Sequence, residues 1–77
     1  MEIMNCNHEY WYEFISILAD LLNEKECSHD HFSSIIALEK ISSKYGIEID
    51  EEKTIYFFKE NGGYCDCEVV YNVHKGD

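Results

Sequence analysis

The chain has 77 residues, 45% of them hydrophobic, which predicts a single small folded domain over residues 1–77 and argues against a disordered segment. Sixteen Asp and Glu residues against six Lys and no Arg give a formal net charge of −10, which disfavours direct binding to nucleic acid. The sequence shows no signal segment and no apolar run near the roughly 18 residues of a membrane span, so we expect a complete, unexported, cytoplasmic protein without membrane insertion.

The first predicted helix covers about residues 8–24, because apolar residues recur there at steps of three and four. Its apolar face comprises Tyr10, Trp11, Phe14, Ile15, Leu18, Leu21 and Leu22. The opposite face carries Glu9, Glu13, Asp20 and Glu24. The pattern predicts an amphipathic helix with an acidic outer surface.

A second helix is expected over about residues 30–45, with Gly46 ending it in the left-handed conformation. Its apolar set is Phe32, Ile35, Ile36, Leu38, Ile41 and Tyr45. A third helix follows over about residues 51–61, capped by Asp50 and stopped by Gly62 and Gly63. Glu51 and Glu52 lie in its first turn, where the helix dipole favours negative charge.

Beyond the two glycines, Val69, Tyr71 and Val73 alternate with Glu68, Val70 and Asn72, the pattern of a half-buried strand. The segment 47–49 is the only partner that the sequence offers for such a strand. We therefore predict a mainly α domain, three helices with a short C-terminal β-ribbon, in the α+β class.

Two cysteine-containing segments predict a metal site that staples this domain. Cys27 and His29 form a Cys-x-His pair between the first two helices, and Cys65 and Cys67 form a Cys-x-Cys pair after the glycines. Three thiolates and one imidazole are a usual tetrahedral zinc set. A protein that is not exported keeps its thiols reduced, so metal binding takes precedence over disulfides. We expect one structural Zn²⁺ per chain.

Other donors compete for this role. His31 could replace His29, and Cys6 with His8 repeats the Cys-x-His spacing near the N-terminus. We rank that terminal pair second, because chain ends tend to fray. Alternatively the cysteines are only small buried hydrophobic residues.

The segment "NGGYCDCEVVYNV" closely resembles the C-terminal signature of a small bacterial family of domains of unknown function, in which a Cys-x-His also follows the first helix. The matching residues are Gly62, Gly63, Tyr64, Cys65, Asp66, Cys67, Glu68, Val69, Asn72 and Val73, with Cys27 and His29 upstream. The stretch "SHDH" departs from the family through its second histidine. The resemblance favours Cys27 and His29 over Cys6 and His8, and it implies no activity.

The function predicted from these features is a small acidic interaction module, stapled by zinc, that docks a basic protein surface without catalysis. The alternative is a nucleic-acid mimic, carried by a phage or mobile element, that inhibits a host enzyme. A second alternative is a zinc-dependent hydrolase, with a base among Asp30, His31, Asp66 and Glu68. We expect no enzyme, because three thiolates blunt the Lewis acidity of the metal and a domain this small has little room for a substrate cleft.

Overall fold

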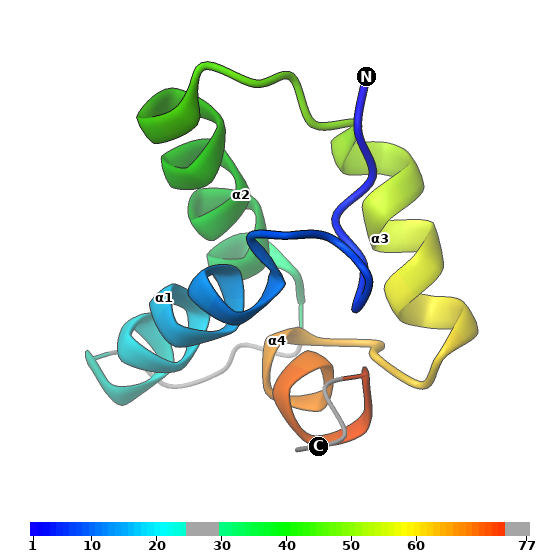
Figure 1. The fold of residues 1–77 in the computed structure, drawn as a ribbon. Coiled ribbons are helices and arrows are strands. Elements are labelled where there is room, and N and C mark those ends of the chain that lie inside the picture. The colour runs from blue at the N-terminus through cyan, green and yellow to red at the C-terminus, as the bar shows by residue number, and fades with distance from the viewer. Residues whose placement is uncertain (25–29, 74–77) are drawn as a thin grey trace.

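The structure is a computed structural model that describes residues 1–24 and 30–73. Its helices are α1 (Trp11–Glu24), α2 (Phe32–Tyr45), α3 (Glu51–Glu60) and α4 (Asp66–Glu68), and α4 continues as the π-helical turn η1 (Val69–Val73). Figure 1 shows α2 and α3 joined by a loop, with the N-terminal segment between them. Helix α1 lies against α2, and α4 lies near the start of α2. Within the described ranges, every helix falls short of the length and apolar character needed to cross a bilayer.

The core forms where the apolar face of α1 meets α2, α3 and η1. Trp11, Phe14 and Leu18 are almost fully buried, as the periodicity of this helix predicts. Phe58 of α3 completes the aromatic cluster, with its ring centroid 5.7 Å from that of Phe14. The prediction of a mainly helical domain is confirmed.

The buried face of α2 differs partly from the predicted one. Leu38 and Ile41 are fully buried as expected, but Phe32 is 56% exposed. Ser34 and Ala37 are fully buried in its place. The apolar pattern of this helix is weak because two serines occupy its inner face near the N-terminus.

The ends of α2 and α3 follow the predicted signals. Gly46 has φ 64°, and its N–H donates to the Ser42 carbonyl at the C-terminus of α2. The Asp50 side chain accepts a hydrogen bond from the Lys53 N–H at the start of α3, at 3.0 Å. Both signals are local, so the sequence suffices to identify them.

A polar cluster joins the outer surfaces of α1 and α2. Glu13 accepts hydrogen bonds from Lys44, at 2.7 Å, and from the hydroxyl of Tyr45, whose ring stacks on that of Tyr10. The hydrogen bond from Lys44 lowers the pKa of Glu13, and it raises the pKa of Lys44. The contribution of Glu13 to stability is therefore present above its ordinary pKa and is lost as the pH falls through the lowered value.

The N-terminal segment is anchored, and the expectation that it frays is wrong. It runs between α2 and α3 (Figure 1), where Met4 is fully buried and its N–H donates to Thr54 Oγ1 at 3.1 Å. An isolated parallel bridge also pairs Glu2 with Ile49. Buried apolar contact and backbone pairing hold a terminus that sequence position alone would leave loose.

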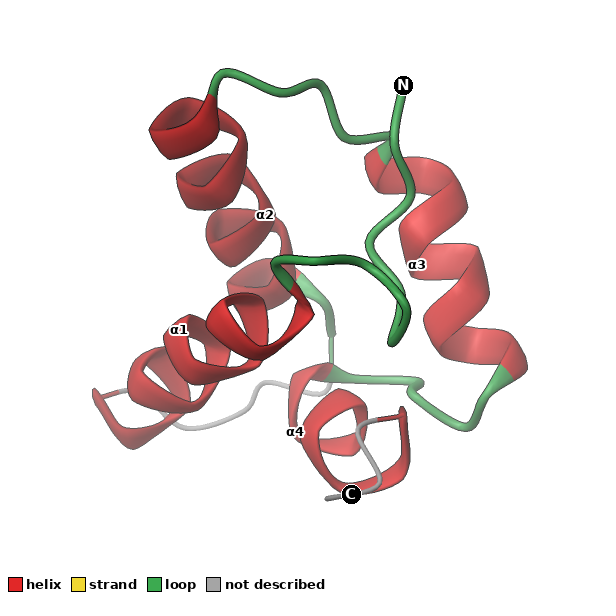
Figure 2. Cartoon of the chain, in the orientation of Figure 1, coloured by secondary structure: helices red, strands yellow, loops and turns green. Residues whose placement is uncertain are grey.

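The predicted C-terminal β-ribbon is wrong, because residues 66–73 are helical and the segments that the structure describes contain no strand (Figure 2). Val69 and Val73 are buried as predicted, but Tyr71 is 78% exposed. Positions four apart lie on one face of a helix as well as on one face of a strand, so the valines fit either structure. The N-terminal segment bridges Ile49, which was the expected partner.

Substitution by aspartate tests whether residues 69–73 form a helix or a strand. Val69→Asp is expected to cost about 2–4 kcal/mol, because it places a carboxylate in apolar surroundings. Tyr71→Asp is expected to cost less than about 0.5 kcal/mol at an exposed position, whereas a strand would make it as harmful as Val69→Asp. Urea unfolding of both variants measures the difference, and equal losses would contradict the helix.

Candidate metal centre

The double glycine after α3 performs two different structural tasks. Gly62 has φ 86°, a left-handed conformation that glycine adopts without strain. Gly63 packs closely against the core, and a Cβ atom built there would lie 2.7 Å from Val73 Cγ2. The pair therefore turns the chain sharply and delivers Cys65 to the start of α4.

Asp66, between the two cysteines, caps the N-terminus of α2 from a distant part of the chain. It is 1% exposed, and its carboxylate accepts hydrogen bonds from the Ser33 N–H at 3.0 Å and the Ser34 N–H at 2.9 Å. The Ser34 hydroxyl also donates to it, at 2.7 Å. Three donors satisfy this buried carboxylate, which sequence reasoning considered only as a candidate base.

Two further hydrogen bonds hold the segment before α2 against the one before α4. The Asp66 N–H donates to the Asp30 carbonyl at 2.7 Å. His31 Nε2 lies 2.8 Å from the Gly63 carbonyl oxygen, and since a carbonyl only accepts, this nitrogen carries the proton. Segments 30–34 and 63–66 are thus locked together beside the cysteines.

The two sulfur atoms of the Cys-x-Cys pair converge as predicted. Cys65 Sγ and Cys67 Sγ lie 3.2 Å apart; Cys65 is buried, whereas Cys67 is half-buried. A tetrahedral zinc with Zn–S bonds of about 2.3 Å would hold two thiolates about 3.8 Å apart. The pair therefore fits two positions of a zinc site after a small separation of the sulfur atoms.

The structure describes only some of the other predicted metal donors. Cys27 and His29 lie outside the described residues. In residues 1–24 and 30–73, no group of three or more His, Cys, Asp or Glu side chains is close enough to hold a metal ion. Because His31 Nε2 donates to Gly63, only Nδ1 of that ring has a lone pair for a metal.

In the rival pair near the N-terminus, the histidine is held by local hydrogen bonds. Cys6 is exposed, and His8 Nδ1 accepts a hydrogen bond from the Tyr10 N–H at 3.0 Å. His8 Nε2 lies 2.6 Å from Glu2 Oε1. Metal binding by His8 would break one of these hydrogen bonds.

Two of the acidic candidate bases of a hydrolase, Asp30 and Asp66, also have structural partners. Asp30 Oδ1 accepts a hydrogen bond from the Phe32 N–H at 3.0 Å, which caps the first turn of α2. Asp66 accepts hydrogen bonds from the next two N–H groups of that helix. Glu68 is half-buried in α4. Asp30 and Asp66 thus serve to start α2.

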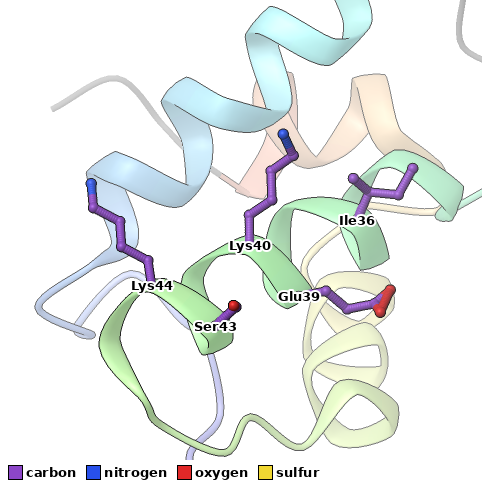
Figure 3. A pocket seen from close by; sticks show the side chains of 5 residues that line it. All are labelled: Ile36, Glu39, Lys40, Ser43 and Lys44. Carbon is purple, nitrogen blue, oxygen red and sulfur yellow. The ribbon is translucent and has the colours of Figure 1, made fainter.

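The acidic face predicted for α1 lies opposite lysines. Figure 3 shows Lys40 and Lys44 extending from α2 on the side toward α1, away from Glu39. The two lysines line one hollow with residues of α1, namely Glu13, Ile17, Asp20, Leu21 and Glu24. Part of the negative charge of α1 is therefore offset within the fold.

Comparison with protein families gives one match. The model of the family described as "Protein of unknown function (DUF2695)" matches residues 14–72, which confirms the resemblance to an uncharacterised family. No curated protein matches the chain significantly. No solved structure does so either.

Proposed function

Because the chain belongs to the DUF2695 family, whose function is unknown, we propose a role from its own residues: a cytoplasmic, non-catalytic interaction module. One structural zinc ion staples it, and its acidic surface docks a basic protein. Cys27, His29, Cys65 and Cys67 would hold the metal, which would supply cross-linking and no chemistry.

The hydrogen bond from the Asp66 N–H to the Asp30 carbonyl carries the zinc proposal. It joins the residue between Cys65 and Cys67 to the residue that follows His29. One residue of chain spans at most about 3.6 Å, so the one and three residues that separate Asp30 from His29 and Cys27 are few enough to let both donors reach this place. The bond thus supports bringing all four donors to one place.

His29 is the preferred histidine because His31 already has a structural task. The His31 ring is half-buried and packs 6.3 Å, centroid to centroid, from Phe58. Its Nε2–H bonds to Gly63, and Nδ1 would have to reach the sulfur atoms without moving this ring. Assigning His29 to the metal leaves that packing intact.

The docking part of the proposal rests on charge and exposed aromatic residues. The net charge of −10 attracts a basic surface and repels nucleic acid. Several large apolar side chains are more than half exposed, among them Tyr12, Tyr56, Tyr64 and Tyr71. Tyrosine is enriched in protein interfaces, since its ring buries apolar area and its hydroxyl keeps a polar contact.

Elemental analysis of protein purified without added metal tests the staple. We expect about one equivalent of zinc in the wild-type protein and in Cys6→Ser, the matched control. Cys27→Ser, Cys65→Ser and Cys67→Ser should each lose most of it.

The histidine variants distinguish the two imidazoles. His29→Ala should lose zinc, whereas His31→Ala should keep zinc and lose stability, because it breaks the hydrogen bond to Gly63. Less than a tenth of an equivalent of any transition metal, in a protein that still melts cooperatively, would mean that the thiols only pack.

A further inference from the structure

An apolar groove runs between α2 and α3. It has a volume of 460 Å³ and is lined by Ile35, Glu51, Glu52, Ile55, Tyr56 and Lys59. Ile35 and Ile55, one from each helix, are only half-buried. The groove therefore exposes aliphatic surface that the core of the chain does not cover.

Aromatic side chains extend this apolar surface at both helices. Tyr56 is 66% exposed, and a hydrogen bond to the Glu60 carboxylate raises the pKa of its hydroxyl. Phe32 is 56% exposed and precedes Ile35 by one helical turn, so the two lie on the same side of α2. Exposed apolar side chains that gather near one groove are more typical of an interaction surface than scattered exposed residues are.

The charges around the groove favour a basic occupant. Glu51 and Glu52 line the end nearest the start of α3, and the exposed Glu48 precedes them in the chain. The acidic residues of α1 instead share a hollow with Lys40 and Lys44. Lys59, the one lysine among the residues that line the groove, comes from the other end of α3. The acidic end is thus free to meet positive charge.

We propose that this groove receives one amphipathic helix of a partner protein, a conclusion that rests on the proposed docking function. The apolar side of that helix packs on Ile35, Ile55 and Tyr56, and its Lys and Arg side chains meet Glu51 and Glu52. A helix fits better than an added strand, because the described segments offer no sheet edge, whereas the groove is lined by side chains of α3 and by Ile35 of α2.

A synthetic 18-residue helix of leucine and lysine, with its leucines on one face, is a suitable probe. Its affinity is measured by fluorescence anisotropy at about 150 mM salt, where a Debye length of about 8 Å suppresses long-range attraction. Amide NMR shifts locate the site. We expect saturable binding with the largest shifts at Ile35, Ile55 and Tyr56, and none with a leucine–glutamate peptide of the same pattern.

Matched variants distinguish binding in the groove from attraction by the net charge of the protein. Glu52→Lys and Tyr56→Ala should each weaken binding about tenfold, as loss of a charge pair or an aromatic contact at an interface does. Glu24→Lys, an exposed residue of α1, changes the net charge as much as Glu52→Lys and should weaken binding less than twofold. Thermal melts check that all three variants are folded.

Three results would contradict the proposal that the groove binds a basic helix. Equal weakening by Glu52→Lys and Glu24→Lys, with shifts elsewhere, would leave a basic partner but place it on another surface. A dimer of the chain alone that Tyr56→Ala dissociates would assign the groove to a second copy. If neither peptide binds, the result would contradict both the proposed use of the groove and the proposed preference for basic partners. The zinc content tests the staple separately.

Discussion

Asp66→Ala is expected to cost the domain about 3–5 kcal/mol, because its carboxylate satisfies three buried donors at the start of α2. Removing it leaves the Ser33 and Ser34 N–H groups and the Ser34 hydroxyl without an acceptor in a site closed to water. Hydrogen bonds to a charged group contribute about 1.5–3 kcal/mol each, and such losses are not additive. Urea denaturation followed by circular dichroism measures the change.

The matched control for this prediction is Asp50→Ala at the start of α3. Asp50 caps its own helix through one exposed hydrogen bond to the Lys53 N–H, so its loss should cost only about 1 kcal/mol. Asp66→Asn should be intermediate, because one amide oxygen can replace only one carboxylate oxygen. Similar losses for Asp66→Ala and Asp50→Ala would show that Asp66 contributes no more than an ordinary local cap.

Removal of zinc is expected to have the largest effect if the proposed staple is correct. Binding free energies at structural zinc sites are about 10–16 kcal/mol in small peptides, comparable to or larger than the 5–15 kcal/mol that stabilises an ordinary domain. A strong chelator should therefore unfold the protein at 25 °C, and added zinc should restore the fold. Circular dichroism at fixed protein concentration reports both steps.

Two comparisons make the chelator experiment specific. Cys6→Ser should respond as the wild-type protein does, whereas Cys65→Ser should be unstable from the start and insensitive to the chelator. Acidification should release metal and unfold the chain together, because protons compete for thiolates and imidazole. An unchanged melting temperature in excess chelator would contradict the staple. It would mean that the hydrophobic core stabilises the fold without a metal.

Features that arise from near neighbours in the chain can be predicted without the fold. Positions three and four apart identify α1 and its buried face, with Trp11, Phe14 and Leu18 inside. Gly46 and Asp50 mark helix ends through hydrogen bonds within four residues. The Cys-x-Cys spacing already implies that Cys65 and Cys67 lie together, since only one residue separates them.

Features that depend on distant partners became visible only in the folded chain. Nothing near Asp66 in the chain shows that it caps a helix starting more than 30 residues earlier, or that Ser34 is buried beside it. Val69 and Val73 fit a strand or a helix equally well in sequence, and the helix places both against the core, where an added Cβ at Gly63 would meet them. Local sequence patterns limit the backbone conformations of a segment. Where two conformations fit the pattern equally well, burial and hydrogen bonds to distant parts of the chain decide between them.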